Sequence, residues 1–166
     1  MKIPICELCA KTGVLCSGCE NKLKAGKISE LDVEVSKILT KLSDKFNLQN
    51  ADVTKVVDLG RVVLILTKGD VGLLIGKDGK VVAELSNKLG KKVRIAEVSG
   101  DMRKTISDMV VPVKLVGINV LYKKDGEKVY KVRLLKSEIR QLPVDINTLE
   151  KALNSVMEST VAITFE

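Results

Sequence analysis

Apolar side chains recur every three or four residues between residues 29 and 46. This spacing predicts an amphipathic helix with one face in the core, and the apolar face is formed by Leu31, Val35, Ile38, Leu39 and Leu42. Ser29, followed three residues later by Asp32, predicts a partial capping box at the start of this helix.

Two apolar runs follow, residues 53–58 and residues 61–67, with Leu59-Gly60 between them. They predict a β-hairpin. The second run is apolar at five consecutive positions, Val62–Leu66, which is typical of a central strand buried on both faces.

The next stretch combines short apolar helices with glycines. A helix is expected from residue 71, a tight turn at Gly76–Gly79, and a second helix to residue 89. Two glycines three residues apart let the backbone bend without Cβ clashes, and the amides that follow lie at a helix N-terminus, where a phosphate oxygen can bind. Lys77 and Lys80 add positive charge, so this turn is a candidate site for a polyanion.

Residues 101–166 predict a second small α+β domain without a G-x-x-G turn. Its expected elements are a linking helix, two strands joined by a turn at Asp125-Gly126, a helix and a last strand, at residues 101–109, 113–122, 129–135, 147–157 and 161–165. The predicted fold class is α+β, with domains at residues 1–28, 29–100 and 101–166.

The first domain contains all four cysteines, as two Cys-x2-Cys pairs: Cys6, Cys9, Cys16 and Cys19. Each pair can wrap one side of a tetrahedral metal, and so short a segment needs a metal or a cross-link to fold. Zinc in a structural role is the expected cofactor, because four thiolates leave no open position for water. Two disulfides or an iron–sulfur cluster are the alternatives.

Positive charge is concentrated in one segment. The chain has 28 Lys and Arg against 21 Asp and Glu, a net charge of +7, which favours a nucleic acid or another polyanion as partner. Residues 113–140 carry eight basic and three acidic side chains, whereas residues 141–166 carry one and four. The predicted hairpin would project Lys123, Lys124, Lys128, Lys131 and Arg133. A solvated strand edge that discourages aggregation is the alternative interpretation.

Rare and absent residue types exclude several function classes. The chain has two Tyr, two Phe and no Trp, which argues against folds that bind bases on broad aromatic platforms. Histidine is absent, so the commonest general base is missing and no enzymatic activity is expected. No apolar run is long enough to cross a bilayer and no signal peptide precedes the cysteines, so a soluble, cytoplasmic protein is expected.

The Gly76–Gly79 turn and its flanks resemble the K-homology (KH) RNA-binding domain. Ile75 precedes the turn, Val82 and Leu85 follow at helical spacing, and the basic strand Lys91-Lys92-Val93-Arg94-Ile95 comes next. The order helix, strand, strand, helix, helix, strand over residues 29–99 is similar to that of the type II, or prokaryotic, KH fold.

This resemblance implies that the turn clamps the backbone of about four single-stranded nucleotides, with their bases over an aliphatic groove. It assigns RNA binding to Ile75, Gly76, Lys77, Asp78, Gly79, Lys80, Val82, Lys92 and Arg94. Asp78 departs from the more basic loops of many family members and implies a weaker contact. The four-cysteine segment or the hairpin lysines, Lys123, Lys124 and Lys128, are therefore candidates for a second contact with RNA.

Within the KH proteins, the chain resembles the NusA-type transcription elongation and termination factors, and more distantly the KH domain of the small ribosomal subunit. Archaeal NusA-like proteins share a four-cysteine segment before such a domain, and Ile5–Cys9 and Lys27–Asp32 look like theirs. The resemblance implies a factor that holds nascent RNA at RNA polymerase.

Three further interpretations remain open for the chain. One is a ribosome-associated or ribosome-assembly factor that binds rRNA, for which zinc fingers and basic hairpins are equally usual. Another is a protein-interaction module in which the G-x-x-G turn is structural. The third concerns only the C-terminal domain, residues 101–166, which is a candidate degenerate relative of the KH domain.

Overall fold

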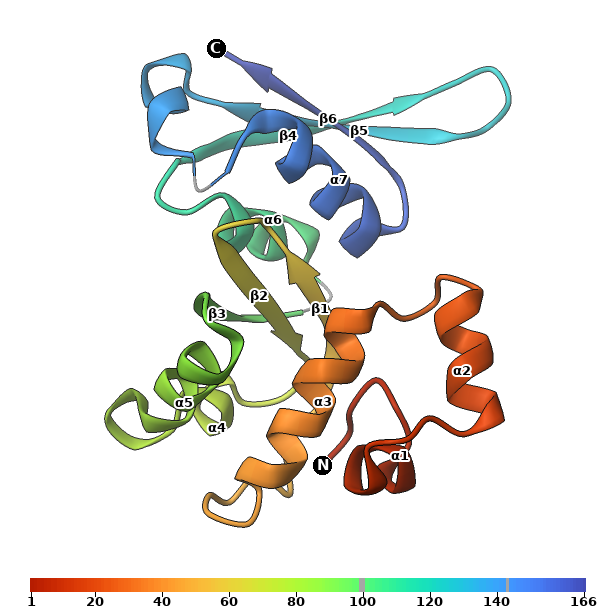
Figure 1. Ribbon diagram of the computed structural model, residues 1–166. Helices are drawn as coiled ribbons and strands as arrows, with labels where there is room; N and C mark the ends of the chain where they lie inside the picture. The colour runs from red at the N-terminus through yellow and green to blue at the C-terminus, as the bar shows by residue number, and fades with distance from the viewer. Residues whose placement is uncertain (99–100, 143) are drawn as a thin grey trace. The chain divides into compact units, whose positions relative to one another are not determined.

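The computed structural model describes residues 1–98, 101–142 and 144–166. The chain forms two compact units, which are drawn in Figure 1. Unit 1 comprises residues 1–58 and 62–98, and unit 2 comprises residues 59–61 and 99–166. Each unit has one three-stranded sheet with helices, which confirms the predicted α+β class.

Unit 1 is built on a mixed sheet in the strand order β1-β2-β3. Strands β1 and β2 are antiparallel, whereas β2 and β3 are parallel. All six residues of β2 are buried, as predicted for a central strand. The elements of this unit are α1 (Glu7–Thr12), α2 (Ser17–Lys24), α3 (Glu30–Leu42), β1 (Val53–Asp58), β2 (Val62–Thr67), α4 (Val71–Ile75), η1 (Lys77–Gly79), α5 (Lys80–Leu89) and β3 (Lys92–Glu97).

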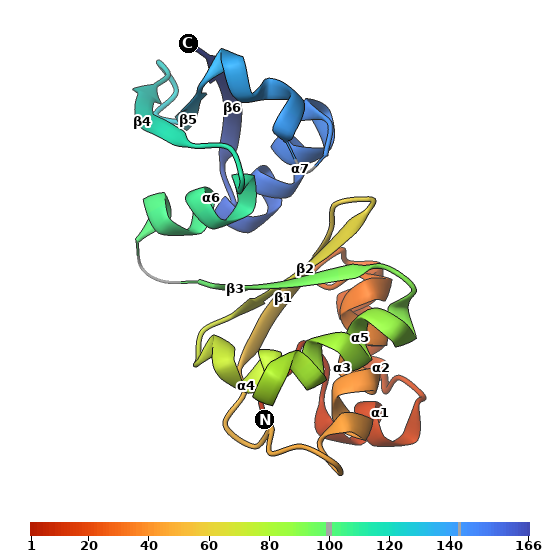
Figure 2. The ribbon, with the colours of Figure 1, turned by 90° about the vertical axis from the view of Figure 1, so that its left-hand side faces the viewer.

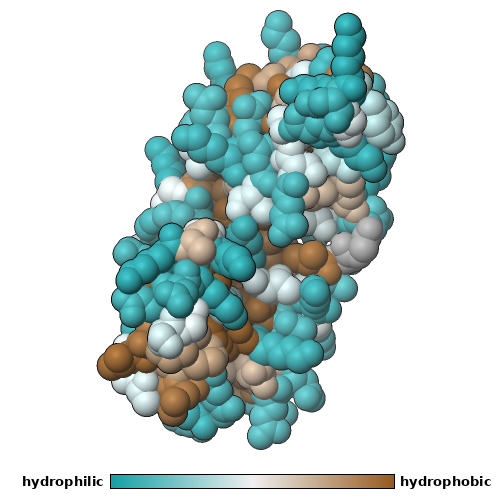
Figure 3. All heavy atoms as spheres, turned by 90° about the vertical axis from the view of Figure 1, so that its right-hand side faces the viewer, coloured by the Kyte–Doolittle hydropathy of each residue, from teal (hydrophilic) through white to brown (hydrophobic). Residues whose placement is uncertain are grey.

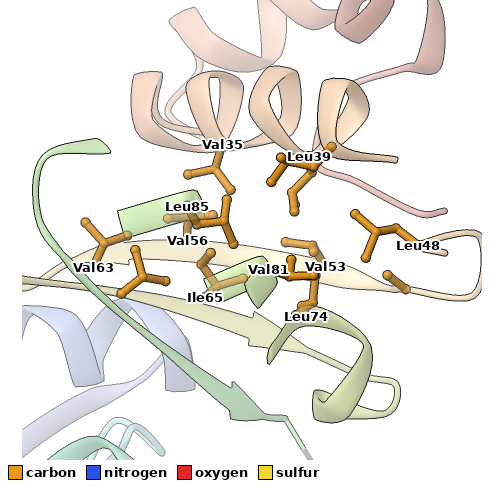
Figure 4. Close-up of a cluster of buried hydrophobic side chains, with 13 residues drawn as sticks. Val35, Leu39, Leu48, Val53, Val56, Val63, Ile65, Leu74, Val81 and Leu85 are labelled. Carbon is orange, nitrogen blue, oxygen red and sulfur yellow. The ribbon is translucent and has the colours of Figure 1, made fainter. Parts of the chain in front are cut away.

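Helices α3 and α5 lie on the same face of this sheet (Figure 2). Their apolar faces meet side chains of β1 and β2 in one buried cluster, part of which is labelled in Figure 4: Val35, Leu39, Val56, Val63, Ile65, Leu74, Val81 and Leu85. The predicted apolar face of α3 is therefore confirmed as core. Helix α3 ends at Leu42 rather than near Phe46, and Phe46 packs against the cluster from the turns that follow.

The four-cysteine segment (residues 1–28) packs onto α3 within unit 1. Its own small cluster of Ile5, Cys9, Ala10 and Cys19 includes Val33 from α3. The chain end is also tied to the sheet, because Lys2 N–H donates to Ala51 O and Val53 N–H donates to Lys2 O, both at 2.8 Å. The two short helices of this segment, α1 and α2, were not predicted from the sequence.

Unit 2 has the strand pairing of unit 1 and, like unit 1 from α3 onwards, the order helix, two strands, helix and strand, but its described residues have no counterpart of α1, α2 or α4. Its elements are α6 (Met102–Val110), β4 (Leu115–Tyr122), β5 (Lys128–Leu134), η2 (Lys136–Gln141), α7 (Ile146–Met157) and β6 (Thr160–Phe165). The sheet order is β4-β5-β6, with β4 and β5 antiparallel and β5 and β6 parallel. In place of a G-x-x-G turn, the helix η2 precedes α7.

Helix α6, predicted as a linker, is an integral part of unit 2. It contacts both α7 and β4, and its side chains Ile106 and Met109 are fully buried. The hairpin β4–β5 extends beyond these helices (Figure 1), and every residue from Asn119 to Lys128 is exposed. Among the residues that the structure describes, each helix is too short or too polar to span a bilayer.

Candidate nucleic-acid interface and metal centre

The turn between α4 and α5 contains three residues with a positive φ, two of which are its glycines. Gly76 has φ +77° and Gly79 has φ +72°, and Asp78 also lies in the left-handed region, at φ +57°. The N–H of Gly76 donates to Gly72 O at 2.9 Å, which closes α4, and the N–H of Gly79 donates to Gly76 O at 3.2 Å. The chain therefore reverses within four residues and starts α5 at once.

Gly76 is in close contact with α5. A Cβ atom at Gly76 would lie 2.5 Å from Val81 Cγ2 and 2.9 Å from Val81 N, whereas a Cβ at Gly79 would meet only Val82 Cγ1, at 3.8 Å. Val81 is itself buried in the core. The first glycine is thus required by close packing as well as by its backbone angle, whereas the second is required by its angle alone.

The side chains around the turn are accessible. Lys77, Asp78 and Lys80 are exposed, Ile75 is exposed just before the turn, and Val82 is half-buried on α5. The structure thus brings two lysines, one carboxylate and an apolar side chain to one end of α5. This arrangement places exposed positive charge at the N-terminal end of α5.

Two other predicted site residues lie further from the turn. Lys92 begins β3 just after α5 ends at Leu89, so it lies at the opposite end of this helix of 10 residues, which is about 15 Å long. Arg94 is half-buried and pairs in register with Leu64. Strand β3 is held beside α5 by a hydrogen bond of 3.2 Å from Val93 N–H to Ser86 Oγ.

The four cysteine sulfurs converge at one point. Their Sγ atoms all lie within 4.8 Å of one another, with Cys6 and Cys9 at 3.1 Å and Cys6 and Cys16 at 4.0 Å. Four thiolates around a tetrahedral zinc, each about 2.3 Å from the ion, would lie about 3.8 Å apart. The donor set therefore fits a metal ion, and Cys9 and Cys19 provide its buried side.

Backbone amides of this segment point at the sulfurs. The N–H of Cys19 donates to Cys16 Sγ at 3.5 Å and, with the neighbouring sulfurs of Cys9 and Cys19, lowers the pKa of Cys16 to about 6. The backbone N–H of Cys9 likewise lowers the pKa of Cys6.

The pKa of Cys9 shifts in the opposite direction. The N–H of Cys16, at 3.0 Å, lowers the pKa of Cys9, but the sulfur of Cys6 and burial outweigh it and raise this pKa to about 12. The surroundings thus favour the thiolate form of Cys16 and the thiol form of Cys9, which must lose its proton to become a ligand.

The four-cysteine segment also exposes two large apolar side chains, which the sequence analysis did not single out. Leu8 is 67% exposed and Val14 is 72% exposed. Figure 3 looks onto this side of the molecule, and hydrophobic side chains gather over α1 at its lower left. Leu8 lies between the two candidate ligands Cys6 and Cys9, and an apolar residue at that place in so short a segment could have marked it in the sequence.

Several cations of the basic hairpin in unit 2 contact neighbouring side chains. Lys123 lies 3.7 Å from a carboxylate oxygen of Glu127, and Lys128 Nζ lies 5.8 Å from the ring centre of Tyr122. Arg133, which we expected to project for binding, instead donates to Glu166 at 2.7 Å and is half-buried. The structure therefore places three exposed lysines at the loop end of the hairpin, around Tyr122, and a further one, Lys131 of β5, opposite Asn119.

No family model matches the chain. Two proteins described as probable transcription termination protein NusA match 55 residues, or 33% of this chain: the one from Methanocaldococcus jannaschii is 47% identical and the one from Methanococcus vannielii is 34% identical. The match spans 30% and 32% of their own lengths. The crystal structure of APE1850 is 20% identical and covers 77% of this chain and 98% of its own, with a TM-score of 0.53, which is evidence of a shared fold alone. One third of the chain is therefore related in sequence to archaeal NusA-like proteins.

Proposed function

We propose that this protein is a non-enzymatic RNA-binding factor that holds single-stranded RNA at the Gly76–Gly79 turn. The observation that carries the proposal is the close packing of Gly76 on Val81, which fixes the turn against α5 while Lys77 and Lys80 remain exposed beside it. The element order of unit 1, with its mixed sheet, is compatible with a type II KH domain, in which such a turn clamps the nucleic-acid backbone.

The hydrogen bonds of the turn indicate which amides remain for a phosphate. Gly79 N–H donates to Gly76 O and Lys80 N–H donates to Lys77 O. The first amides of a helix have no acceptor within that helix, so the N–H groups of Lys77 and Asp78 are the proposed phosphate donors. Lys77 adds a charge-assisted contact, whereas the carboxylate of Asp78 weakens binding through like-charge repulsion.

The partial similarity to NusA proteins supports a role in transcription elongation or termination. In this role the protein would hold nascent RNA close to RNA polymerase. A ribosome-associated role with rRNA as ligand uses the same RNA-binding site. Isolation of the tagged protein with and without ribonuclease treatment distinguishes the two roles, because polymerase subunits are expected in the first and ribosomal proteins in the second.

Zinc is the proposed ligand of the cysteine cluster. Cys6, Cys9, Cys16 and Cys19 would hold it with four thiolates, which leaves no position for a reacting water. The metal would therefore stabilise the segment that packs on Val33 of α3 and take no part in chemistry.

Replacing Lys77 with Asp tests the proposed clamp. The substitution keeps both glycines but places a second carboxylate next to Asp78, so affinity for short single-stranded RNA should fall at least about tenfold. Lys45→Asp is the matched control, because Lys45 is exposed in the same unit and the change in net charge is identical. If Lys77→Asp melts like the parent and binds RNA as tightly, the turn is not the clamp.

A second candidate function, protein docking through the four-cysteine segment, is favoured by the exposed Leu8 and Val14. Exposed apolar side chains on a rigid segment are typical of interaction sites. The double substitution of Leu8 and Val14 by Ser should then reduce recovery of partner proteins while RNA affinity stays unchanged. Equal recovery with the parent protein would contradict this function.

A further inference from the structure

The loop end of the β4–β5 hairpin, which we call the hairpin tip (residues 120–130), exposes apolar surface on both faces. Val120, Leu121 and Tyr122 are consecutive and all exposed, and Tyr122 is 71% exposed. Consecutive strand residues point to opposite faces, so the helices of unit 2 cover neither face at this end. Such exposure requires an explanation, because soluble proteins seldom leave large apolar side chains exposed together.

Both tyrosines of the chain lie on one face of the hairpin tip. Tyr122 pairs in register with Lys128, and Val120 pairs with Tyr130. Side chains two positions apart on a strand share a face, so Tyr122, Tyr130 and the Val120 between them form a single surface. In a chain with only four aromatic residues, this placement concentrates half of them at one site.

The Tyr122 ring is held from one side by a cation. Lys128 Nζ lies 5.8 Å from its centroid, a distance at which the ammonium is attracted to the ring face. Because the ring is 71% exposed, its other face is open to solvent. The ring is therefore oriented before any ligand binds, and its open face is available to a flat partner.

Lysines lie next to this open ring, in a loop that also carries Asp125 and Glu127. Lys123 and Lys124 follow Tyr122 directly. Lys123 forms an ion pair with Glu127 at 3.7 Å, whereas Lys124 has no carboxylate within 4.0 Å among the described residues. A flat ring close to the unpaired ammonium of Lys124 matches a nucleotide, whose base stacks and whose phosphate is negative.

We propose that the hairpin tip is a second single-stranded RNA site, in which one base stacks on Tyr122 and the adjacent phosphate contacts Lys124. The proposal rests on the proposed function for its ligand, RNA, but it does not require the Gly76–Gly79 turn. Leu121, on the opposite face of the same strand, takes no part in the stack.

The experiment compares Tyr122→Ala, Tyr122→Phe and Leu121→Ala in the full-length protein. The probes are a labelled oligouridine of about ten nucleotides and an abasic oligonucleotide of the same length and charge. Tyr122→Ala should weaken oligouridine binding at least about fivefold and leave abasic binding unchanged, because it removes a stacked base but no phosphate contact. Tyr122→Phe keeps the ring and should bind like the parent, as should Leu121→Ala.

The same titrations in the Lys77→Asp background separate the two sites. If Tyr122→Ala weakens binding while Lys77→Asp has no effect, the hairpin site stands and the proposed clamp fails. If oligouridine binds Tyr122→Ala as tightly as the parent, or if the loss is equal for the abasic probe, the stacking site is refuted. An unchanged RNA affinity is also the result expected if the ring docks a protein.

Discussion

The carboxylate of Asp32 joins helix α3 to strand β1. Asp32 Oδ1 accepts a hydrogen bond of 2.7 Å from the backbone N–H of Val56, although 24 residues separate the two. Its other oxygen, Oδ2, accepts from the Ser29 N–H at 2.8 Å and from Ser29 Oγ at 3.1 Å. At 2% exposure, this is a buried charge satisfied by three donors, which both caps the helix and fixes it to the sheet.

We expect Asp32→Ala to lower the free energy of unfolding by about 2–4 kcal/mol, since it removes a cap and leaves the buried Val56 N–H without an acceptor. Urea denaturation measures the change. Glu30→Ala is the control, because Glu30 is an exposed acid in the same first turn and its loss should cost under about 0.5 kcal/mol. Equal urea midpoints for the two variants would show that the hydrogen bond to Val56 contributes nothing to the free energy of unfolding.

The two glycines of the turn should respond differently to alanine. Gly76→Ala should destabilise by about 1–3 kcal/mol more than Gly79→Ala, because both positions need a positive φ but only Gly76 would clash with the buried Val81. Thermal melting of the two variants gives this difference directly. RNA affinity should also fall in Gly76→Ala, since the turn must shift away from α5. Indistinguishable melting curves would exclude close packing at Gly76 as the constraint.

Metal binding is testable on the purified protein, which should contain one zinc for its one four-cysteine cluster. Cys9→Ser or Cys16→Ser should release the zinc and unfold the four-cysteine segment, while the β1–β3 sheet stays folded. Zinc content by mass spectrometry and backbone amide spectra provide the readouts. Ser17→Ala is the control, because Ser17 is exposed between Cys16 and Cys19 and offers no thiolate to a metal. Two intact disulfides, or no metal in the parent, would overturn the assignment.

The lysines of the hairpin should contribute to binding through phosphates. Replacing Lys123, Lys124 and Lys128 with Glu should weaken the binding of all single-stranded RNA sequences alike. It should also reduce the slope of log affinity against log salt concentration by roughly 0.7 per lost contact. The control replaces Lys41, Lys45 and Lys88, which are exposed in unit 1, and should leave the slope near that of the parent. An unchanged slope in the hairpin variant would make the hairpin a solvated strand edge.

Several features could be predicted from the sequence because they depend on neighbours along the chain. The apolar repeat of α3, its capping box at Ser29, and the run that forms β2 all match the structure within a few residues. The cysteine spacing predicted a cluster, and the Sγ atoms do converge. Helical and strand periodicities are local properties, so they can be recognised without knowledge of the fold.

The tertiary structure alone decided which distant residues meet. Val33 lies outside the predicted apolar face of α3, yet it is buried because α1 packs on that side of the helix. Arg133 looked free in the sequence but pairs with Glu166, which comes within reach only because β5 and β6 are parallel neighbours with Arg133 opposite Thr164. Tyr122 is exposed because the β4–β5 hairpin extends beyond the helices that cover the rest of its sheet. Contacts between residues far apart along the chain set the strand register, the packing of helices and the length of an element relative to its neighbour. The hydrophobic pattern of the sequence does not predict these contacts.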